Sequence, residues 1–513
     1  MTWSYADAPQ LRNLPALLRH RMKSPDKVFI RNGDGRDFTF FEVWALAGQM
    51  ANALAAGGVK TGDRVAVQVD KSPEAVTLFL ACARLGAVYL PLNTAYTLAE
   101  IDYFVGDAQP SALIVMPERL DAIAGLAGRH KVGALFSLGI AGDGTFMDET
   151  RVQPRGFTDA KVGWDDLAAI LYTSGTTGRS KGAMLSQGNL TSNALTLIDT
   201  WRFSERDVLI HALPVYHTHG LFTATNTLLL SGGTMLFRQK FDADDVMRLM
   251  PEATAMMGVP TFYTRLLQHQ GLTREATAHM RLFISGSAPL LADTHREFSR
   301  RTGHAILERF GMTETNMNTS NPYDGERIAG TVGLPLPGVE VRITDPDSGR
   351  PLTTGEIGMI EVRGPNVFKG YWRMPEKTAS EFRLDGFFIT GDLGRIDDNG
   401  YVSIVGRGKD LIITGGFNVY PKEVESEIDS IAGVVESAVI GVPHPDFGEG
   451  VTAVVVRAGN TLIEKDIVKT LEGRLARFKL PKQVIFVDDL PRNAMGKVQK
   501  NVLRQAYADL YRS

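Results

Sequence analysis

A dense group of glycine, hydroxyl and lysine residues follows a short apolar run, AAILY, near residue 170. The segment LYTSGTTGRSKGAMLS occupies residues 171–186, and its candidate phosphate ligands are Thr173, Ser174, Gly175, Thr176, Thr177, Gly178 and Lys181. Glycines let backbone N–H groups approach a ligand closely, hydroxyls donate to phosphate oxygens, and lysine adds a positive charge. The pattern therefore predicts a loop that binds a polyphosphate. A flexible linker is the alternative, but linkers seldom carry this density of hydroxyls directly after a strand.

The loop is not of the Walker A type. The pattern G-x-x-x-x-G-K-[ST] does not occur in the sequence, and the Gly-Lys pairs at 408–409 and 496–497 have other flanking residues. The phosphate-binding prediction therefore depends on the glycines and hydroxyls themselves.

Several segments resemble, in order, the motifs of the acyl-adenylating superfamily, which includes acyl-CoA synthetases, luciferases and peptide-synthetase adenylation domains. After the loop come RFGMTET (309–315), ITGDLG (389–394), GRGKDLIITGGFNVYP (406–421) and PRNAMGK (491–497). The resemblance covers roughly residues 25–505, and several ordered motifs are far more specific than one. It implies an enzyme that activates a carboxylic acid as an acyl-adenylate, with Mg²⁺ and with ATP and CoA as co-substrates.

The resemblance also implies which residues bind the nucleotide. The adenine-flanking segments would supply Gly286, Ser287, Ala288, Glu308, Arg309, Phe310, Gly311, Met312 and Thr313. Phe310 stands where the family usually has tyrosine, and its ring can still stack on adenine. Glu314, with Thr176, would hold Mg²⁺. Asp392 would accept hydrogen bonds from the ribose hydroxyls, to which Arg407 could donate.

Two further segments are expected to act together in domain movement and catalysis. Lys409 matches the family's hinge position, and Gly415 and Gly416 follow it on the face expected to meet CoA; a glycine-rich hairpin is the alternative. Lys497 matches the C-terminal catalytic lysine and would stabilise charge developing on the α-phosphate. On local evidence alone it would be a solvated lysine. Acetylation of Lys497 by a lysine acetyltransferase, reversed by a deacetylase, would remove its charge.

Specificity for the acid is expected near three residues. His217 lies in LPVYHTHG, where the family places a histidine beside the acyl site, and it is also a catalytic candidate. Arg265 lies in GVPTFYTRLL, and a guanidinium at a pocket wall, with Ser285 nearby, suits a second carboxylate on the substrate. The alternative is that Arg265 points to solvent.

The chain therefore looks most like malonyl-CoA synthetases, with methylmalonate as a secondary substrate. A CoA ligase for a short-chain, medium-chain or aryl monocarboxylic acid is the alternative. A nucleotide-binding regulatory protein with an inactive site is a third interpretation.

The elements that must position these residues follow an α/β pattern. Apolar runs alternate with helical stretches and predict strands at 64–70, 87–92, 111–116, 207–213, 234–237 and 282–285. Such runs are typical of parallel sheets covered by helices. A segment rich in Gly and Pro, at about 328–406, predicts a barrel-like antiparallel part. We expect a large N-terminal adenylating domain, residues 1–408, and a small mobile α+β domain, residues 409–513, with its hinge at Lys409.

Composition narrows the function classes. The chain has 513 residues, a net charge of −3 and 44% hydrophobic residues, which is ordinary globular usage and does not call for nucleic acid or an anionic membrane as partner. Cys82 is the one cysteine, so an intrachain disulfide and a multi-cysteine metal site are excluded. The sequence shows no targeting segment, and we expect a cytoplasmic protein. Residues 470–513 hold nine basic and four acidic residues. This excess of positive charge indicates either a solvated face or a module that binds a polyphosphate.

Overall fold

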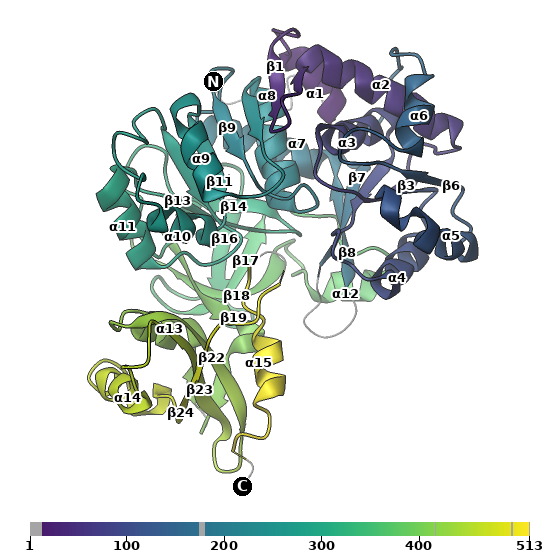
Figure 1. Cartoon of the computed structure of the whole chain (residues 1–513). Coiled ribbons are helices and arrows are strands. Elements are labelled where there is room, and N and C mark those ends of the chain that lie inside the picture. Colours follow the sequence, from purple (N-terminus) through teal and green to yellow (C-terminus); the bar gives the residue numbers. More distant parts are fainter. Residues whose placement is uncertain (1–12, 174–179, 416, 494–495, 512–513) are drawn as a thin grey trace.

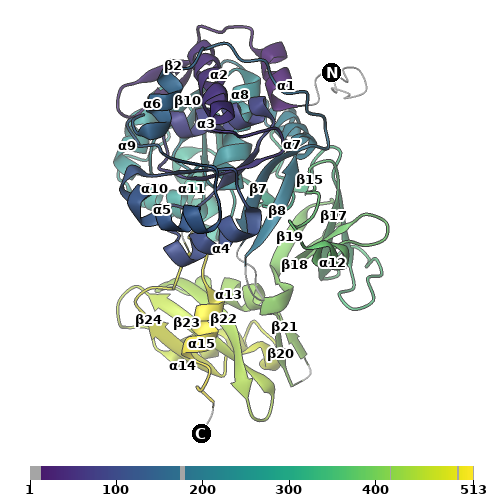
Figure 2. The ribbon, with the colours of Figure 1, turned by 90° about the vertical axis from the view of Figure 1, so that its right-hand side faces the viewer.

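The computed structural model describes residues 13–173, 180–415, 417–493 and 496–511 (Figure 1). Two large sheets lie side by side in the upper part of the molecule, and a small antiparallel sheet adjoins them. The C-terminal elements lie below these sheets in both views (Figures 1 and 2). This is the α/β arrangement of a large and a smaller part that the sequence predicts.

The first large sheet has six strands in the order β6-β5-β3-β4-β7-β8. They are β3 (Arg64–Gln68), β4 (Val88–Pro91), β5 (Ala112–Val115), β6 (Ala134–Ser137), β7 (Leu167–Thr173) and β8 (Lys181–Ser186). All neighbouring pairs are parallel except β7 and β8. The predicted strands at 64–70, 87–92 and 111–116 are confirmed, with ends that differ by one or two residues.

The second large sheet has nine strands in the order β15-β14-β13-β12-β11-β9-β10-β1-β2. They are β1 (Val28–Asn32), β2 (Asp37–Thr39), β9 (Val208–His211), β10 (Thr234–Phe237), β11 (Ala255–Gly258), β12 (Leu282–Ser285), β13 (Leu307–Met312), β14 (Asn316–Ser320) and β15 (Leu334–Pro335). The central strands from β1 to β13 are parallel. The carboxyl ends of β12 and β13 therefore meet at one edge, where Ser285 and the residues after Met312 lie.

Helices cover both sheets and share one core with them. They are α1 (Leu14–Arg21), α2 (Phe40–Ala56), α3 (Pro73–Leu85), α4 (Leu98–Ala108), α5 (Leu120–Arg129), α6 (Thr145–Arg151), α7 (Gln187–Thr200), α8 (Asn226–Ser231), α9 (Ala243–Leu249), α10 (Pro260–Gln268), α11 (Ala292–Thr302) and α12 (Pro375–Ser380). Short helical turns are η3 (Pro117–Arg119), η4 (His219–Thr225) and η5 (Met250–Glu252). Residues of α3, α7 and η4 pack together in the largest hydrophobic cluster.

Helix α3 shows how sequence fixes an element in this core. Its first residue is Pro73, and the Ser72 side chain accepts a hydrogen bond from the Ala75 N–H, an N-cap that satisfies a free donor. Every residue of the helix is buried, including Cys82. Burial raises the pKa of the Cys82 thiol, so this cysteine is protonated and unreactive.

A four-stranded antiparallel sheet, in the order β16-β17-β18-β19, confirms the antiparallel prediction for the Gly- and Pro-rich segment. Its strands are β16 (Glu340–Thr344), β17 (Gly358–Arg363), β18 (Phe388–Ile396) and β19 (Val402–Arg407). Its first and last strands do not pair, so the described part forms an open sheet. A bridge between Gly333 and Val402 connects it to the segment before β15.

The C-terminal part has its own sheet and hydrophobic core. Its elements are η6 (Gly408–Asp410), β20 (Ile412–Thr414), β21 (Phe417–Val419), α13 (Pro421–Asp429), β22 (Val434–His444), β23 (Gly448–Arg457), α14 (Glu464–Glu472), η7 (Arg477–Lys479), β24 (Gln483–Val487) and α15 (Lys500–Ala506). Strands run in the order β21-β20-β23-β22, and β24 pairs with β23. In the described part of the chain, no helix combines the length and the apolar character needed to span a bilayer.

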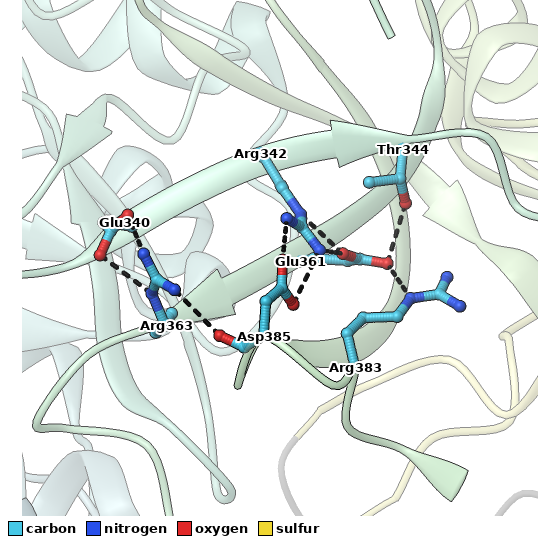
Figure 3. A network of polar contacts seen from close by, with 7 residues as sticks. All are labelled: Glu340, Arg342, Thr344, Glu361, Arg363, Arg383 and Asp385. Carbon is cyan, nitrogen blue, oxygen red and sulfur yellow. Dashed lines mark hydrogen bonds and ion pairs between the residues drawn. The ribbon is translucent and has the colours of Figure 1, made fainter. Parts of the chain in front are cut away.

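A buried carboxylate organises the outer face of the small sheet (Figure 3). Glu361 of β17 is fully buried, and its two oxygens accept hydrogen bonds from Arg342 at 2.8 Å, Arg383 at 2.7 Å and Thr344 at 2.9 Å. A buried charge is stable only when it is paired and hydrogen-bonded. Glu361 therefore ties the segment containing Arg383 to the sheet.

We expect Glu361→Gln to lower the free energy of unfolding by about 2–3 kcal/mol, because Arg383 would lose its charged partner and Arg342 would keep only Asp385. Glu340→Gln is the matched control, since Glu340 pairs with Arg363 in the same sheet but is exposed. Urea denaturation of both variants measures the difference. Equal midpoints for the two variants would contradict the role given to Glu361.

Candidate active site

The predicted phosphate loop connects two antiparallel strands. Thr173 at the end of β7 pairs with Lys181 at the start of β8. The Thr173 hydroxyl donates a hydrogen bond to the Lys181 carbonyl at 3.4 Å. Ser174, Gly175, Thr176, Thr177 and Gly178 lie outside the described residues. The hairpin thus fixes both ends of the loop, and their ligand roles stay predictions.

The Lys181 ammonium lies in a polar cluster that the sequence analysis did not include. Its Nζ is 3.3 Å from an oxygen of Glu381 and 4.6 Å from the ring centre of Tyr371. The Tyr371 hydroxyl is 2.7 Å from Glu381 and 3.1 Å from Glu314. No spacing rule links residues 181, 314, 371 and 381, so sequence reasoning had no signal for this cluster.

Glu314 lies in the turn between β13 and β14. It is buried, and burial raises the pKa of its carboxyl group. The described residues contain no group of three or more His, Cys, Asp or Glu side chains that could hold a metal. A single buried carboxylate, completed by phosphate oxygens and water, is a donor set that suits Mg²⁺. Thr176, the other predicted metal ligand, is outside the described residues.

Asp392 and Arg407 are brought together as the resemblance implies. They face each other across β18 and β19, with an Arg407 Nε to Asp392 Oδ1 distance of 2.7 Å. Burial raises the pKa of Asp392, although the positive charges of Arg407, Lys497 and Lys409 act against it. The Asp392 carboxylate could accept hydrogen bonds from ribose hydroxyls, and the adjacent Arg407 guanidinium could donate to them.

Lys497, from the C-terminal part, lies close enough to Asp392 and Arg407 for their charges to act on it. Its side chain has solvent access but is surrounded by protein on most sides, so burial is the main cause that lowers its pKa. The charges of Arg407 and Arg309 lower it further, while Asp392 and Glu314 raise it. A Cβ atom on Gly496 would lie 3.8 Å from Thr261 of α10, so the lysine loop packs against the larger part.

Arg309 on β13 contributes a buried guanidinium to this group of residues. The residue is only 4% exposed, and its Nε and Nη2 atoms are buried without a hydrogen-bond partner. A Cβ atom on Gly286 would lie 2.4 Å from Arg309 Cζ, so a larger residue at this position would displace the guanidinium. Burial lowers the pKa of Arg309 to about 9.

Two histidines line this part of the cleft. Burial and the charge of Lys497 lower the pKa of His217 to about 3, so its imidazole is neutral. Burial and the charge of Arg309 lower the pKa of His219 far below its ordinary value. His219 begins η4, a π-helical segment, and its Nδ1 lies 3.2 Å from the Ser287 hydroxyl. The Ser285 hydroxyl and His217 Nε2 are buried and unpartnered.

Arg265, which was predicted to bind a second carboxylate of the acid, keeps that role as a prediction. It is exposed, because Tyr263 and Leu266 form the buried face of α10 and the residue between them points outward. The helical period of GVPTFYTRLL already indicates that Arg265 lies on the face opposite the apolar residues of this helix. The buried arginine of the site is Arg309, which the sequence analysis assigned to the nucleotide.

The remaining predicted residues lie around these groups. Phe310 is 7% exposed, and Gly286, Ser287, Ala288, Gly311, Met312 and Thr313 border the ends of β12 and β13. Lys409 lies in η6, where burial lowers its pKa, and the adjacent Asp410 forms an ion pair with Arg504. Gly415 follows β20, and Gly416 is outside the described residues.

Two family matches cover most of the chain. Residues 17–372 match the AMP-binding enzyme family, and residues 423–497 match the AMP-binding enzyme C-terminal domain. The chain belongs to the AMP-binding enzyme family. This AMP-binding enzyme is an AMP-forming acyl-CoA ligase that uses ATP and CoA as co-substrates together with Mg²⁺.

Similar proteins include ligases for different acids. A feruloyl-CoA synthase from an Amycolatopsis species is 38% identical over 96% of this AMP-binding enzyme and 98% of the relative. A malonate–CoA ligase from Arabidopsis thaliana is 34% identical over 94% and 86% of the two chains. The crystal structure of ATP-bound MatB from Rhodopseudomonas palustris superposes with a TM-score of 0.96 at 64% identity, covering 98% of this chain and 99% of that one.

A pH-dependent stability follows from Glu308, a predicted nucleotide residue on β13. Burial raises its pKa to about 8 against an ordinary 4.5, although the charge of Lys422 acts in the opposite direction. The fold therefore favours the neutral carboxyl, and its contribution to stability is lost as pH rises from about 4.5 to about 8.

We expect Glu308→Gln to gain thermal stability relative to the wild type as pH rises, because an amide avoids burying a charge. The difference in melting temperature between variant and wild type should be larger at pH 8 than at pH 5. A difference that is the same at both pH values would refute this account.

Proposed function

We propose that the chain is an ATP-dependent malonyl-CoA synthetase. The reaction is malonate + ATP + CoA to malonyl-CoA + AMP + pyrophosphate, through a malonyl-AMP intermediate. The observation that carries this proposal is the Arg309 guanidinium, which is buried near Gly286 and His219 with two nitrogens unpartnered. A substrate that carries a second carboxylate supplies the missing partner.

The physical argument is that a buried charge needs a counter-charge. A guanidinium binds a carboxylate through two parallel hydrogen bonds, which suits the paired free nitrogens of Arg309. A monocarboxylic acid with an alkyl or aryl tail would leave that charge unpaired, an arrangement that is strongly unfavourable. The feruloyl-type alternative therefore fits this pocket less well than a dicarboxylate.

The proximity of two cations favours a short dicarboxylate. The charge of Arg309 acts on Lys497, the residue proposed to stabilise the reacting centre. One carboxylate of the acid must meet the α-phosphate near Lys497 while the other meets Arg309. Malonate has a single carbon between its carboxylates, and methylmalonate keeps that spacing. Relatives named as malonate–CoA ligases agree with this choice.

The site residues divide the first half-reaction among them. Arg309, with the hydroxyl of Ser285 and the neutral His217, orients the acid so that its free carboxylate oxygen faces the α-phosphate. Lys497 stabilises the negative charge that develops as pyrophosphate leaves. Glu314 would hold Mg²⁺, which neutralises phosphate charge when bound.

The second half-reaction needs a different arrangement. We propose that the C-terminal part, from Lys409 onward, turns about Lys409, withdraws Lys497 and brings the face carrying Gly415 toward the CoA thiol. The thiol then attacks the acyl carbon, the bond to AMP breaks, and AMP leaves.

A cytoplasmic location and acetylation of Lys497 stay predictions.

Substitution of Arg309 tests the acid assignment. Arg309→Met should lower kcat/KM for malonate roughly a hundredfold or more, because a buried charge partner is lost. Activity with acetate or with ferulate should fall much less. The measurement is AMP release with CoA across a panel of acids. Arg300→Met is the matched control and should leave malonate activity unchanged, since Arg300 is exposed on α11 and pairs with Glu297 of the same helix.

Two results would overturn the assignment. Equal losses for malonate and acetate in Arg309→Met would remove the dicarboxylate argument. A wild-type preference for ferulate over malonate would favour the monocarboxylate ligase instead.

Substitution of Lys497 separates the half-reactions. Lys497→Ala should slow malonate-dependent ATP–pyrophosphate exchange about 100-fold to 1000-fold, because a charged stabiliser is lost. Thioester formation from supplied malonyl-AMP should be largely preserved, since the lysine is withdrawn for that step. Normal exchange by the variant would show that Lys497 has another role.

A further inference from the structure

The Tyr371 hydroxyl lies between two carboxylates in the floor of the site. Tyr371 is only 3% exposed, and its hydroxyl is 3.1 Å from Glu314 and 2.7 Å from Glu381. Glu314 comes from the turn after β13, whereas Glu381 follows α12. One hydroxyl therefore fixes the relative position of two acidic groups from distant segments.

Glu381 is paired with two lysines of different kinds. Lys377, one helical turn earlier, is 2.6 Å away and is 42% exposed. Lys181, at the end of the predicted phosphate loop, is 3.3 Å from the same oxygen of Glu381 and is 15% exposed. Burial acts to raise the pKa of Glu381, but hydrogen bonds from Lys377 and Tyr371 and the charge of Lys181 outweigh it. Glu381 is therefore an ionised partner for both lysines.

A lysine at this position has two competing uses. An ammonium group beside the predicted phosphate loop can bind the phosphate oxygens of ATP. In the structure, the Lys181 ammonium is occupied by Glu381 and by the face of the Tyr371 ring. Phosphate oxygens carry more negative charge than one carboxylate, so they can displace Glu381, and Lys377 then remains as the cation beside it.

We propose that Glu381 holds Lys181 while no nucleotide is bound and releases it to the phosphates of ATP. Tyr371 acts as a positioning residue that holds Glu381 and Glu314 at fixed places during this exchange. The proposal rests on ATP binding, which the family establishes, and is independent of which acid is used.

A double-mutant cycle on ATP affinity tests the exchange. Binding of ATP alone, in EDTA and without acid or CoA, is measured by isothermal titration calorimetry. Lys181→Met should weaken binding about tenfold, and Glu381→Gln should tighten it roughly threefold to tenfold by freeing Lys181. In the Lys181→Met background, Glu381→Gln should have no effect, because there is no lysine left to release.

Lys377→Met is a matched test that should change ATP affinity in the direction opposite to Glu381→Gln. Removal of the exposed lysine leaves Glu381 to pair more strongly with Lys181, so ATP binding should weaken, and only when Lys181 is present. The exchange is disproved if Glu381→Gln weakens ATP binding, or changes it by the same factor with and without Lys181. It is also disproved if Lys377→Met changes affinity equally in both backgrounds.

The role of Tyr371 has a separate readout. Tyr371→Phe keeps the ring and removes the hydroxyl, so it should weaken binding of Mg·ATP severalfold more than binding of ATP in EDTA, since Glu314 loses its fixed position. Tyr401→Phe is the control, because that hydroxyl donates to a carbonyl outside the site, that of Glu326, at 2.8 Å. An equal effect on both forms of ATP, or none, would overturn the positioning role.

These tests are distinguishable from those of the acid assignment. ATP affinity is measured in the absence of any carboxylic acid, so a different acid specificity would leave the predicted cycle intact. A failed cycle would likewise leave the malonate preference of the wild type untouched.

Discussion

Positive charge gathered around one cleft is the constraint on which the site depends. Arg309 comes from the nine-stranded sheet, Arg407 from the small antiparallel sheet and Lys497 from the C-terminal part. Burial and the repulsion of the two arginines lower the pKa of the lysine, whereas Asp392 and Glu314 act in the opposite direction. The polyanionic nucleotide and the carboxylate of the acid relieve this repulsion. Substrate charge therefore stabilises the arrangement that brings the three segments together.

The parts of the fold that sequence predicted are those with a local physical signature. Short apolar runs between helical stretches are typical of buried parallel strands. Strands β3, β4, β10 and β12 form at such runs. Ordered motifs predicted that Asp392 and Arg407 would meet, and the two residues pair across β18 and β19. In these cases the information lies within a few consecutive residues or in a complete motif.

The parts that sequence did not predict depend on distant segments. Arg265 and Arg309 are both arginines among apolar neighbours, and which of them is buried depends on helix phase in α10 and on the space above Gly286. The contact of Tyr371 with Glu314 and Glu381 joins residues 57 and 10 positions apart. Such contacts appear only when the sheets are assembled, because no local periodicity encodes them.

The single cysteine makes the proposed movement of the C-terminal part accessible to spectroscopy. Cys82 is enclosed in α3, and burial keeps its thiol protonated. A maleimide dye would therefore not react with Cys82. A second cysteine can be introduced at an exposed position of the C-terminal part, for example by Asp509→Cys. The dye would then label only this introduced thiol. Rotation of that part could then be followed by fluorescence anisotropy or energy transfer in a protein whose native thiol needs no replacement.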